Sequence, residues 1–297
     1  MEHIPVLLKE TIEFLAVRAG GKYVDGTFGR GGHTKAILSK GGDVLGIDRD
    51  DEAIASARGV KVVKGNHAEI RRIANENGWE EVDGILLDLG VSSPQLDEAG
   101  RGFSFLREGP LDMRMDRAGG VTAADIVNGS SVEKLEEIFR NWGEEPKARQ
   151  IAKAIVRARE ERGTRFATTK ELADFIEGIV GRHGGHHPAT RVFQALRMEV
   201  NGEMAGLRAA LEGGLQILKA GGRFAIITFE SVTDREVKQF FARHIGKRRS
   251  LQSGGERWEG DLPKVRAVTH GVITASEDEL KINPRARSAK LRVIEKE

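Results

Sequence analysis

The chain has 297 residues, with 47 lysines and arginines against 45 aspartates and glutamates, 37 glycines and no cysteine. This length exceeds that of a typical domain of about 100–150 residues, so we expect one large α/β domain or a domain with an insertion. The missing cysteines exclude disulfides, thiolate metal sites, iron–sulfur clusters and cysteine nucleophiles.

The sequence carries no signal for a membrane or for export. No apolar run approaches the roughly 18–20 residues that a membrane helix needs. The first residues lack the basic and apolar regions of a signal peptide, and the absence of cysteine is compatible with a reducing compartment. We therefore expect a cytoplasmic protein with no membrane partner.

The first 90 residues alternate short apolar runs with amphipathic stretches. Apolar runs without alternation are typical of parallel strands that are covered on both faces. The pattern predicts strands at Lys22–Asp25, Asp43–Asp48, Val60–Lys64 and Val82–Leu89, and helices at His33–Ser39, Glu52–Arg58 and Ala68–Asn77. Strands and helices that alternate at this spacing form βαβ units in a doubly wound sheet.

This alternation stops between Met113 and Glu199, where we predict helices and no strand. Thr168 is the predicted N-cap of one of these helices, and Glu171 completes a capping box. Further on, an amphipathic helix ends near Gly221. After it we predict strands at Gly222–Phe229, Val265–Val268 and Lys290–Ile294, and a helix at Arg235–Arg243. The simplest account is one α/β domain that is split by a helical insertion.

A glycine-rich turn joins the first strand to the first helix of the α/β domain. The segment Val24–His33 reads VDGTFGRGGH, and glycines allow a ligand to lie against the backbone. Asp48 ends the second strand, 19 residues beyond Gly29. A carboxylate there can accept hydrogen bonds from both ribose hydroxyls of an adenosine ligand. A cap on the following helix is the alternative role for Asp48.

The details of this turn favour S-adenosylmethionine over a dinucleotide. Gly29 and Gly31 begin a G-x-G pattern, but Thr34 stands where a dinucleotide fingerprint needs its third glycine. Acidic Asp25 precedes the glycines, as in methyltransferases that use S-adenosylmethionine. A P-loop is excluded because the chain has no G-K-[ST] motif.

The fourth strand ends in Asp88, which is followed by Leu89–Gln95 (LGVSSPQ). The carboxyl ends of parallel strands meet at one edge of the sheet, so this loop faces the same crevice as the glycine turn. Methyltransferases that act on amines carry a polar residue and a nearby proline at this position. Acceptors for the N–H protons favour localisation of the amine lone pair. Methylation at a pyrimidine C5 usually needs a thiolate, which this chain lacks.

Five segments together resemble one known family, the ribosomal RNA small-subunit methyltransferase H family, also called MraW. They are Asp25–His33, Gly84–Asp97 (GILLDLGVSSPQLD), Arg101–Asp116 (RGFSFLREGPLDMRMD), His187–Met198 (HPATRVFQALRM) and Asn283–Val293 (NPRARSAKLRV). The resemblance implies methylation of a cytidine N4 amine in the decoding region of bacterial 16S rRNA, in the small ribosomal subunit, with S-adenosylmethionine as cofactor. It also implies a Rossmann-like class I methyltransferase domain at residues 1–112 and 200–297, with an all-helical domain inserted at 113–199.

The resemblance also assigns cofactor contacts to particular residues. These are Gly31, Gly32, His33, Asp48, His67, Asp88 and Gln95. The family usually has an aromatic residue beside the adenine where this chain has His67. It also commonly has a histidine where this chain has Glu230, which weakens any mechanism that uses a histidine base there.

Asp112 is the candidate catalytic residue. In one interpretation it reaches the target amine while Arg114 binds a phosphate. In the other, Pro110–Asp116 is a hinge into the insertion, and Met113 and Met115 are core residues. The sequence alone does not favour either.

Three further groups of residues have alternative roles. A metal site at His183, His186 and His187 is not expected, because no carboxylate cluster accompanies these histidines and metal sites need three or four converging ligands. Trp79 and Trp142 can stack on RNA bases or pack in the core. Ser92 and Ser93 do not form the G-x-S-x-G motif of a hydrolase.

The near-zero net charge conceals three basic stretches. Residues 147–197 have a net charge of +6, and residues 235–249 and 281–292 each have +5, so the rest of the chain is acidic. Such a distribution suits a face that binds RNA phosphates, and solvated helix faces are the alternative. Two rival functions are a methyltransferase for another amine, in DNA or protein, and a non-catalytic RNA-binding assembly factor. We expect no DNA substrate.

Overall fold

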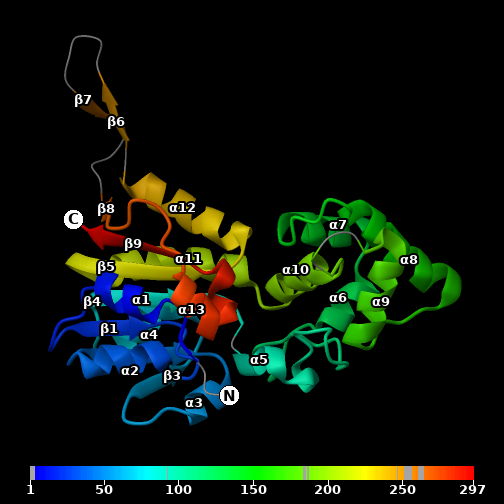
Figure 1. The fold of residues 1–297 in the computed structure, drawn as a ribbon, viewed down its shortest axis with the longest axis horizontal. Coiled ribbons are helices and arrows are strands. Elements are labelled where there is room, and N and C mark those ends of the chain that lie inside the picture. Colours follow the sequence, from blue (N-terminus) through cyan, green and yellow to red (C-terminus); the bar gives the residue numbers. More distant parts are fainter. Residues whose placement is uncertain are drawn as a thin grey trace. The chain divides into compact units, whose positions relative to one another are not determined.

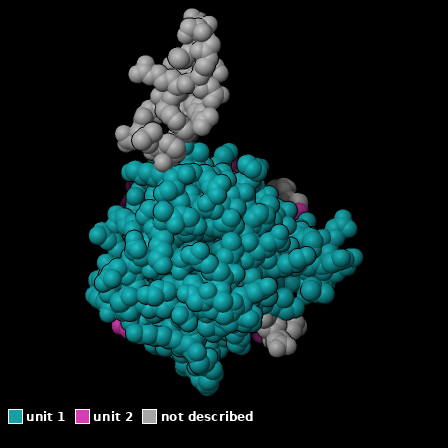
Figure 2. Space-filling model, turned by 90° about the vertical axis from the view of Figure 1, so that its left-hand side faces the viewer, with its two compact units in different colours: residues 1–90, 205–297 teal, residues 91–204 magenta. Residues whose placement is uncertain are grey.

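The computed structural model describes residues 4–91, 93–182, 185, 187–245, 247–250, 256–259 and 264–297. The chain forms two compact units; Figure 1 shows the ribbon of both, and Figure 2 shows one face of unit 1 in teal. Unit 1 comprises residues 1–90 and 205–297, and unit 2 comprises residues 91–204.

Unit 1 is built on a seven-stranded sheet with the order β3-β2-β1-β4-β5-β9-β8. The strands are β1 (Lys22–Asp25), β2 (Asp43–Asp48), β3 (Lys61–Lys64), β4 (Val82–Asp88), β5 (Leu218–Thr228), β8 (Val265–Ala267) and β9 (Lys290–Lys296). The first five strands pair in parallel, and β9 is antiparallel to both β5 and β8. The strand order reverses between β1 and β4, which is where ligands bind in doubly wound folds.

Helices cover both faces of this sheet. They are α1 (Leu8–Phe14), α2 (Gly32–Ser39), α3 (Asp51–Ala55), α4 (Ile70–Glu76), α11 (Glu203–Ile217), α12 (Ser231–Ile245) and α13 (Glu277–Ile282). Successive residues of a strand pack into two hydrophobic cores, one on each face of the sheet. Leu87 packs in the core with α4, α11 and α12, whereas Leu86 packs in the core with α1 and α2. The buried strands therefore have few polar positions, which explains their continuous apolar runs.

The expected α/β fold of unit 1 is confirmed. The first four strands agree with their predicted positions to within one residue. The fifth begins at Leu218, four residues before the predicted start at Gly222. Its pairing with β4 shifts from Leu218 opposite Val82 to Arg223 opposite Gly84, and this irregularity is not visible as an apolar run. Residues Lys247–Ser250 (β6) and Glu256–Glu259 (β7) form a separate antiparallel pair.

Unit 2 is helical in the part of the chain that the structure describes. It contains α5 (Ser93–Asp97), α6 (Ala123–Gly129), α7 (Val132–Asn141), α8 (Ala148–Arg162), α9 (Thr169–Val180) and α10 (Thr190–Val200). The capping box at the start of α9 is present: the Thr168 hydroxyl accepts the Glu171 N–H, and the Glu171 carboxylate accepts the Thr168 N–H.

The helical unit begins at residue 91, earlier than the expected boundary at residue 113. Phe103 and Leu111 are buried in its core, and the Leu111 N–H donates to the Ala167 carbonyl at 2.9 Å. At the other end, Arg197 pairs with Glu203 at 2.8 Å, so the unit extends past residue 199. These ends are set by long-range contacts rather than by local periodicity, so the sequence pattern placed the boundaries too far inside the unit.

Across the described residues, no helix combines the length and the apolar character that are needed to span a membrane.

Candidate active site

Three carboxylates end three adjacent strands of unit 1. Asp25 is the last residue of β1, Asp48 of β2 and Asp88 of β4. Strand β1 pairs with β2 on one side and with β4 on the other, and all three strands are parallel. Their carboxyl ends therefore lie at one edge of the sheet, at the point where the strand order reverses.

Asp25 shapes the turn after β1. Its carboxylate accepts the Thr34 hydroxyl at 2.7 Å and the Thr27 N–H at 3.2 Å. The side chain is only 2% exposed, and burial raises its pKa to about 6. Thr27 also connects two strands, because its hydroxyl oxygen accepts the Asp88 N–H at 2.6 Å. Asp25 therefore holds the turn together from inside the protein.

The glycines of this turn have different roles. Gly29 and Gly31 have φ angles of 54° and 70°, a conformation that disfavours larger residues. Gly31 is the N-cap of α2, and no side chain of the described residues caps this helix. The N–H groups of its first turn can therefore serve a ligand carboxylate. At Gly32 the limit is packing, because a Cβ there would overlap the Pro5 ring.

Asp48 holds the same turn from the neighbouring strand. Its carboxylate accepts the Gly29 N–H at 2.7 Å and the Asp50 N–H at 2.9 Å. The following helix is capped by Asp50, which accepts the Glu52 N–H, so Asp48 does not provide the α3 cap. Burial raises the pKa of Asp48.

His33 and Asp88 form a pair beside the turn. His33 Nε2 lies 3.0 Å from the Val6 carbonyl oxygen, and Nδ1 lies 3.8 Å from Asp88 Oδ2. Burial, followed by repulsion from Asp25, raises the pKa of Asp88 to about 7. The pair can therefore hold a proton near neutral pH.

His67 follows β3 in a short 3-10 helix, His67–Glu69. Its Nε2 atom is buried without a hydrogen-bond partner among the described residues. Burial, assisted by the positive charge of Arg49, lowers the pKa of His67 to about 4. The imidazole is thus neutral at physiological pH and can stack on a base as an uncharged aromatic ring.

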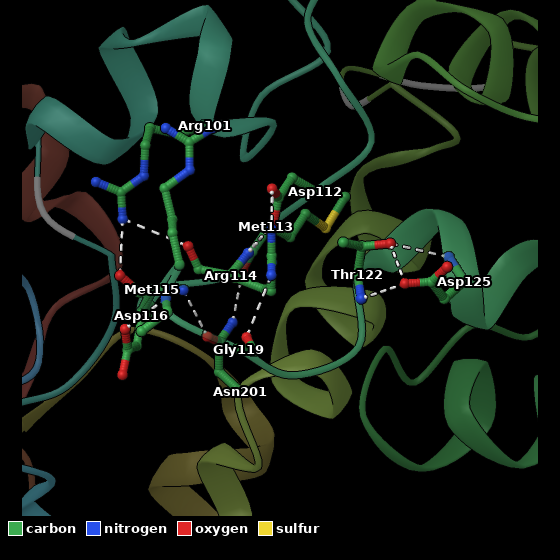
Figure 3. Close-up of polar contacts among 12 residues, drawn as sticks. Arg101, Asp112, Met113, Arg114, Met115, Asp116, Gly119, Thr122, Asp125 and Asn201 are labelled. Atoms are coloured by element: carbon green, nitrogen blue, oxygen red, sulfur yellow. Dashed lines mark hydrogen bonds and ion pairs between the residues drawn. The ribbon is translucent and has the colours of Figure 1, made fainter.

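Two predicted site residues belong to unit 2. Gln95 lies in α5 and is 7% exposed. Asp112 accepts three hydrogen bonds from Arg114: from N at 3.1 Å, Nε at 2.8 Å and Nη2 at 2.9 Å. Figure 3 shows this pair. The Arg114 guanidinium lowers the pKa of Asp112, so its carboxylate is ionised and already occupied.

The segment around Asp112 is held on several sides, as Figure 3 also shows. The Asn201 amide bonds to the Met115 N–H and the Met113 carbonyl, both at 2.8 Å. Arg101 donates to the Met115 carbonyl at 2.9 Å. Met113 is fully buried, and Met115 packs against the same core. These contacts agree with the interpretation in which both methionines are core residues.

The remaining candidates of the sequence have structural contacts. His187 Nε2 lies 3.1 Å from a Glu177 carboxylate oxygen, whereas His183 and His186 lie outside the described residues. Among the described residues, no group of three or more histidines and carboxylates could hold a metal ion. Trp142 donates to Glu199 at 2.8 Å, and Trp79 packs against the core of unit 1.

The comparison with known proteins identifies the family. The sequence model of the MraW methylase family matches residues 1–297. The chain belongs to the MraW methylase family. A protein of Methylobacterium nodulans named "Ribosomal RNA small subunit methyltransferase H" is 48% identical, over 99% of this chain and 90% of its own length. A protein of the same name from Shewanella frigidimarina is 44% identical, over 99% and 97%.

As a member of the MraW methylase family, the chain is a methyltransferase that uses S-adenosylmethionine, and the expected family and cofactor are confirmed. A solved putative methyltransferase from Streptococcus mutans, in complex with SAH, is 13% identical, covers 99% of both chains and has a TM-score of 0.43. Because a TM-score this low does not establish a common fold, the fold assignment rests on the strand order of the sheet.

The residues of unit 1 fit this cofactor. An uncapped helix start suits the carboxylate of its amino-acid end, and two carboxylates with raised pKa values, the buried Asp25 and the half-buried Asp88, suit its positive charges. The sequence pattern missed Thr27 and Thr34, which hold the turn in place. The sequence does contain a signal for these two threonines, because small hydroxyl residues flank the glycines of the turn.

Proposed function

We propose that the chain transfers a methyl group from S-adenosylmethionine to the N4 amine of a cytidine in the decoding region of bacterial 16S rRNA. The observation that carries this proposal is the match over 99% of the chain to proteins named for the small ribosomal subunit. An enzyme with this substrate acts in the cytoplasm, which is the compartment that we propose.

The cofactor contacts that we propose in unit 1 are Gly31, Gly32, His33, Asp48, His67 and Asp88. The assignment of Gln95, which belongs to unit 2, rests on the family resemblance alone. The first turn of α2 would bind the carboxylate of the cofactor, Asp48 its ribose and His67 its adenine. When bound, the cofactor supplies a methyl group on a positively charged sulfur.

Asp88 is suited to the amine end of the reaction. It ends β4, at the position where amine-directed methyltransferases carry an acceptor for the N–H protons. In its ionised form the Asp88 carboxylate can accept an N–H of the target amine and so orient its lone pair. Asp112 is already occupied by Arg114, so we assign it a positioning role in the segment 110–116.

The basic stretches differ in their availability to RNA. On α8, Arg149, Lys153 and Arg157 are exposed, although Arg149 lies 3.8 Å from Glu136 and Arg157 lies 2.7 Å from Glu161. Near the C-terminus, Arg292 pairs with Asp234 at 2.7 Å in a largely buried contact. We propose that α8 contributes phosphate contacts, whereas Arg292 is structural.

Methyl transfer from tritiated cofactor tests the substrate. Purified small subunits, naked 16S rRNA, DNA and ribosomal protein would be offered separately. We expect label in the RNA of the subunit or in naked 16S rRNA, and label only in protein or only in DNA would overturn the proposal. Mass mapping of 16S rRNA from cells that lack the gene should show one decoding-region cytidine without its methyl group.

A further inference from the structure

Residues 4–7, which we call the N-terminal strap, lie across the start of α2. A Cβ at Gly32 would overlap the Pro5 ring, so the two backbones approach closely. The next residue of the strap, Val6, places its carbonyl oxygen 3.0 Å from His33 Nε2. Two consecutive strap residues thus contact two residues that we assign to the cofactor site.

The strap is fastened at both ends by the C-terminal region of the same unit. Glu279 of α13 accepts the Leu7 N–H at 2.8 Å, and the Asn283 amide donates to the Ile4 carbonyl at 3.2 Å. Asn283 is only 8% exposed. Leu7 has a φ of 51°, a left-handed conformation that is costly for leucine and needs such contacts to persist.

These contacts determine which nitrogen of His33 carries a proton. A carbonyl oxygen can only accept, so a hydrogen bond to Val6 requires the proton on Nε2. In the neutral ring, Nδ1 then presents its lone pair, 3.8 Å from Asp88 Oδ2. One proton between Nδ1 and Asp88 satisfies both groups, either as an imidazolium with a carboxylate or as an imidazole with a carboxylic acid.

We propose that Glu279 and Asn283 are positioning residues for cofactor binding. Through the N-terminal strap they hold His33 in its Nε2-protonated form, with Nδ1 toward Asp88. This proposal rests on the assignment of His33 to the cofactor site. The C-terminal segment of the chain, more than 240 residues distant in sequence, thus acts on the first turn of α2.

Calorimetric titration of the full-length chain with S-adenosylmethionine tests the proposal. We expect Glu279→Ala and Asn283→Ala to weaken binding by about tenfold, the loss that corresponds to one buried hydrogen bond. Glu279→Gln should restore binding, because its amide oxygen can still accept the Leu7 N–H. Glu277→Ala on the same helix is the matched control, since its side chain is exposed, and it should bind as the wild type does.

The ¹⁵N chemical shifts of the His33 imidazole report which ring nitrogen carries the proton. A variant that only destabilised the fold would leave these shifts unchanged. They are assigned by comparison with His33→Asn. We expect an Nε2–H signal in the wild type and a mixture of the two neutral forms in Glu279→Ala, at melting temperatures within about 2 °C of each other. A wild-type neutral ring that is protonated on Nδ1 and not on Nε2 would overturn the proposal, as would unchanged affinity in both alanine variants.

Two further outcomes separate the possible failures. If the wild type does not bind S-adenosylmethionine at all, the assignment of the cofactor site fails together with the strap proposal. If the wild type binds and both alanine variants lose affinity only in proportion to a lower melting temperature, with the His33 shifts unchanged, the strap proposal alone is overturned.

Discussion

The Asp48 carboxylate accepts the backbone N–H of Gly29 at 2.7 Å, so the end of the second strand holds the turn that follows the first. Asp48 also bonds to the Asp50 N–H through its other oxygen. A carboxylate held in this way is prepared to accept the hydroxyls of a ribose without rearrangement, because its orientation is fixed before the ligand binds.

Replacement of Asp48 should therefore weaken cofactor binding. We expect Asp48→Ala to lower the affinity for S-adenosylmethionine by about 10- to 100-fold, since it removes charge-assisted hydrogen bonds and frees the Gly29 N–H. Asp48→Asn should lose less, because its amide oxygen can still accept the Gly29 N–H. Calorimetric titration measures both effects.

Asp43 provides the control for this experiment. It is the first residue of the same strand and is exposed at the opposite end. Asp43→Ala should bind the cofactor with wild-type affinity. Equal affinities for Asp48→Ala and the wild type would remove Asp48 from the cofactor site.

The stability of the cofactor-free protein should depend on pH through Asp25 and Asp88. Burial raises their pKa values to about 6 and about 7, above the ordinary value of 3.8. Between about pH 4 and pH 7 the folded chain retains protons that the unfolded chain has released, so the free energy of unfolding decreases as the pH rises. Urea unfolding across this range measures the slope.

Asp88→Asn should reduce this slope and stabilise the free protein near pH 7. We expect the free energy of unfolding to rise by about 1–3 kcal/mol. This is less than the full pKa shift would give, because the side chain of Asp88 is 23% exposed to solvent. Asp43→Asn, which replaces an exposed carboxylate at the start of β2, is the control variant. A slope that Asp88→Asn does not alter would show that this carboxyl ionises normally.

The first strands of unit 1 were predictable because they are short apolar runs that end in polar residues. The position of Asp48 at a strand end followed from that pattern alone. The start of the helical unit was not predictable, because Phe103 and Leu111 lie in irregular segments and are buried only by distant helices. The contact between Leu7 and Glu279 spans 272 residues and has no local signal at all.

The ion pair of Asp112 and Arg114 distinguishes a positioning role from a catalytic one. The two side chains are 12% and 22% exposed, so breaking the pair leaves a largely buried charge. We expect Asp112→Ala and Arg114→Ala to lower the free energy of unfolding by similar amounts, about 3 kcal/mol each. Their double variant should be destabilised by less than the sum.

Methyl transfer separates the two roles of Asp112. If it positions its segment, Asp112→Asn and Arg114→Ala should lower kcat to a similar extent. Asp116→Asn is the matched control, because its amide oxygen can still accept the Ala118 N–H. A loss of kcat of about 100-fold or more in Asp112→Asn alone would instead identify a catalytic carboxylate.

His67 should be replaceable by phenylalanine. Its Nε2 atom is buried without a partner among the described residues, and its pKa of about 4 keeps the ring neutral. Phenylalanine retains the aromatic face and removes the unsatisfied nitrogen, so we expect His67→Phe to bind S-adenosylmethionine at least as tightly and to gain about 1 kcal/mol in stability.

His67→Ala should lose about tenfold in affinity, the contribution of one stacked base. The exposed His270, replaced by alanine, should change neither quantity. Weaker binding by His67→Phe than by the wild type would mean that a ring nitrogen, rather than the aromatic face, contacts the cofactor.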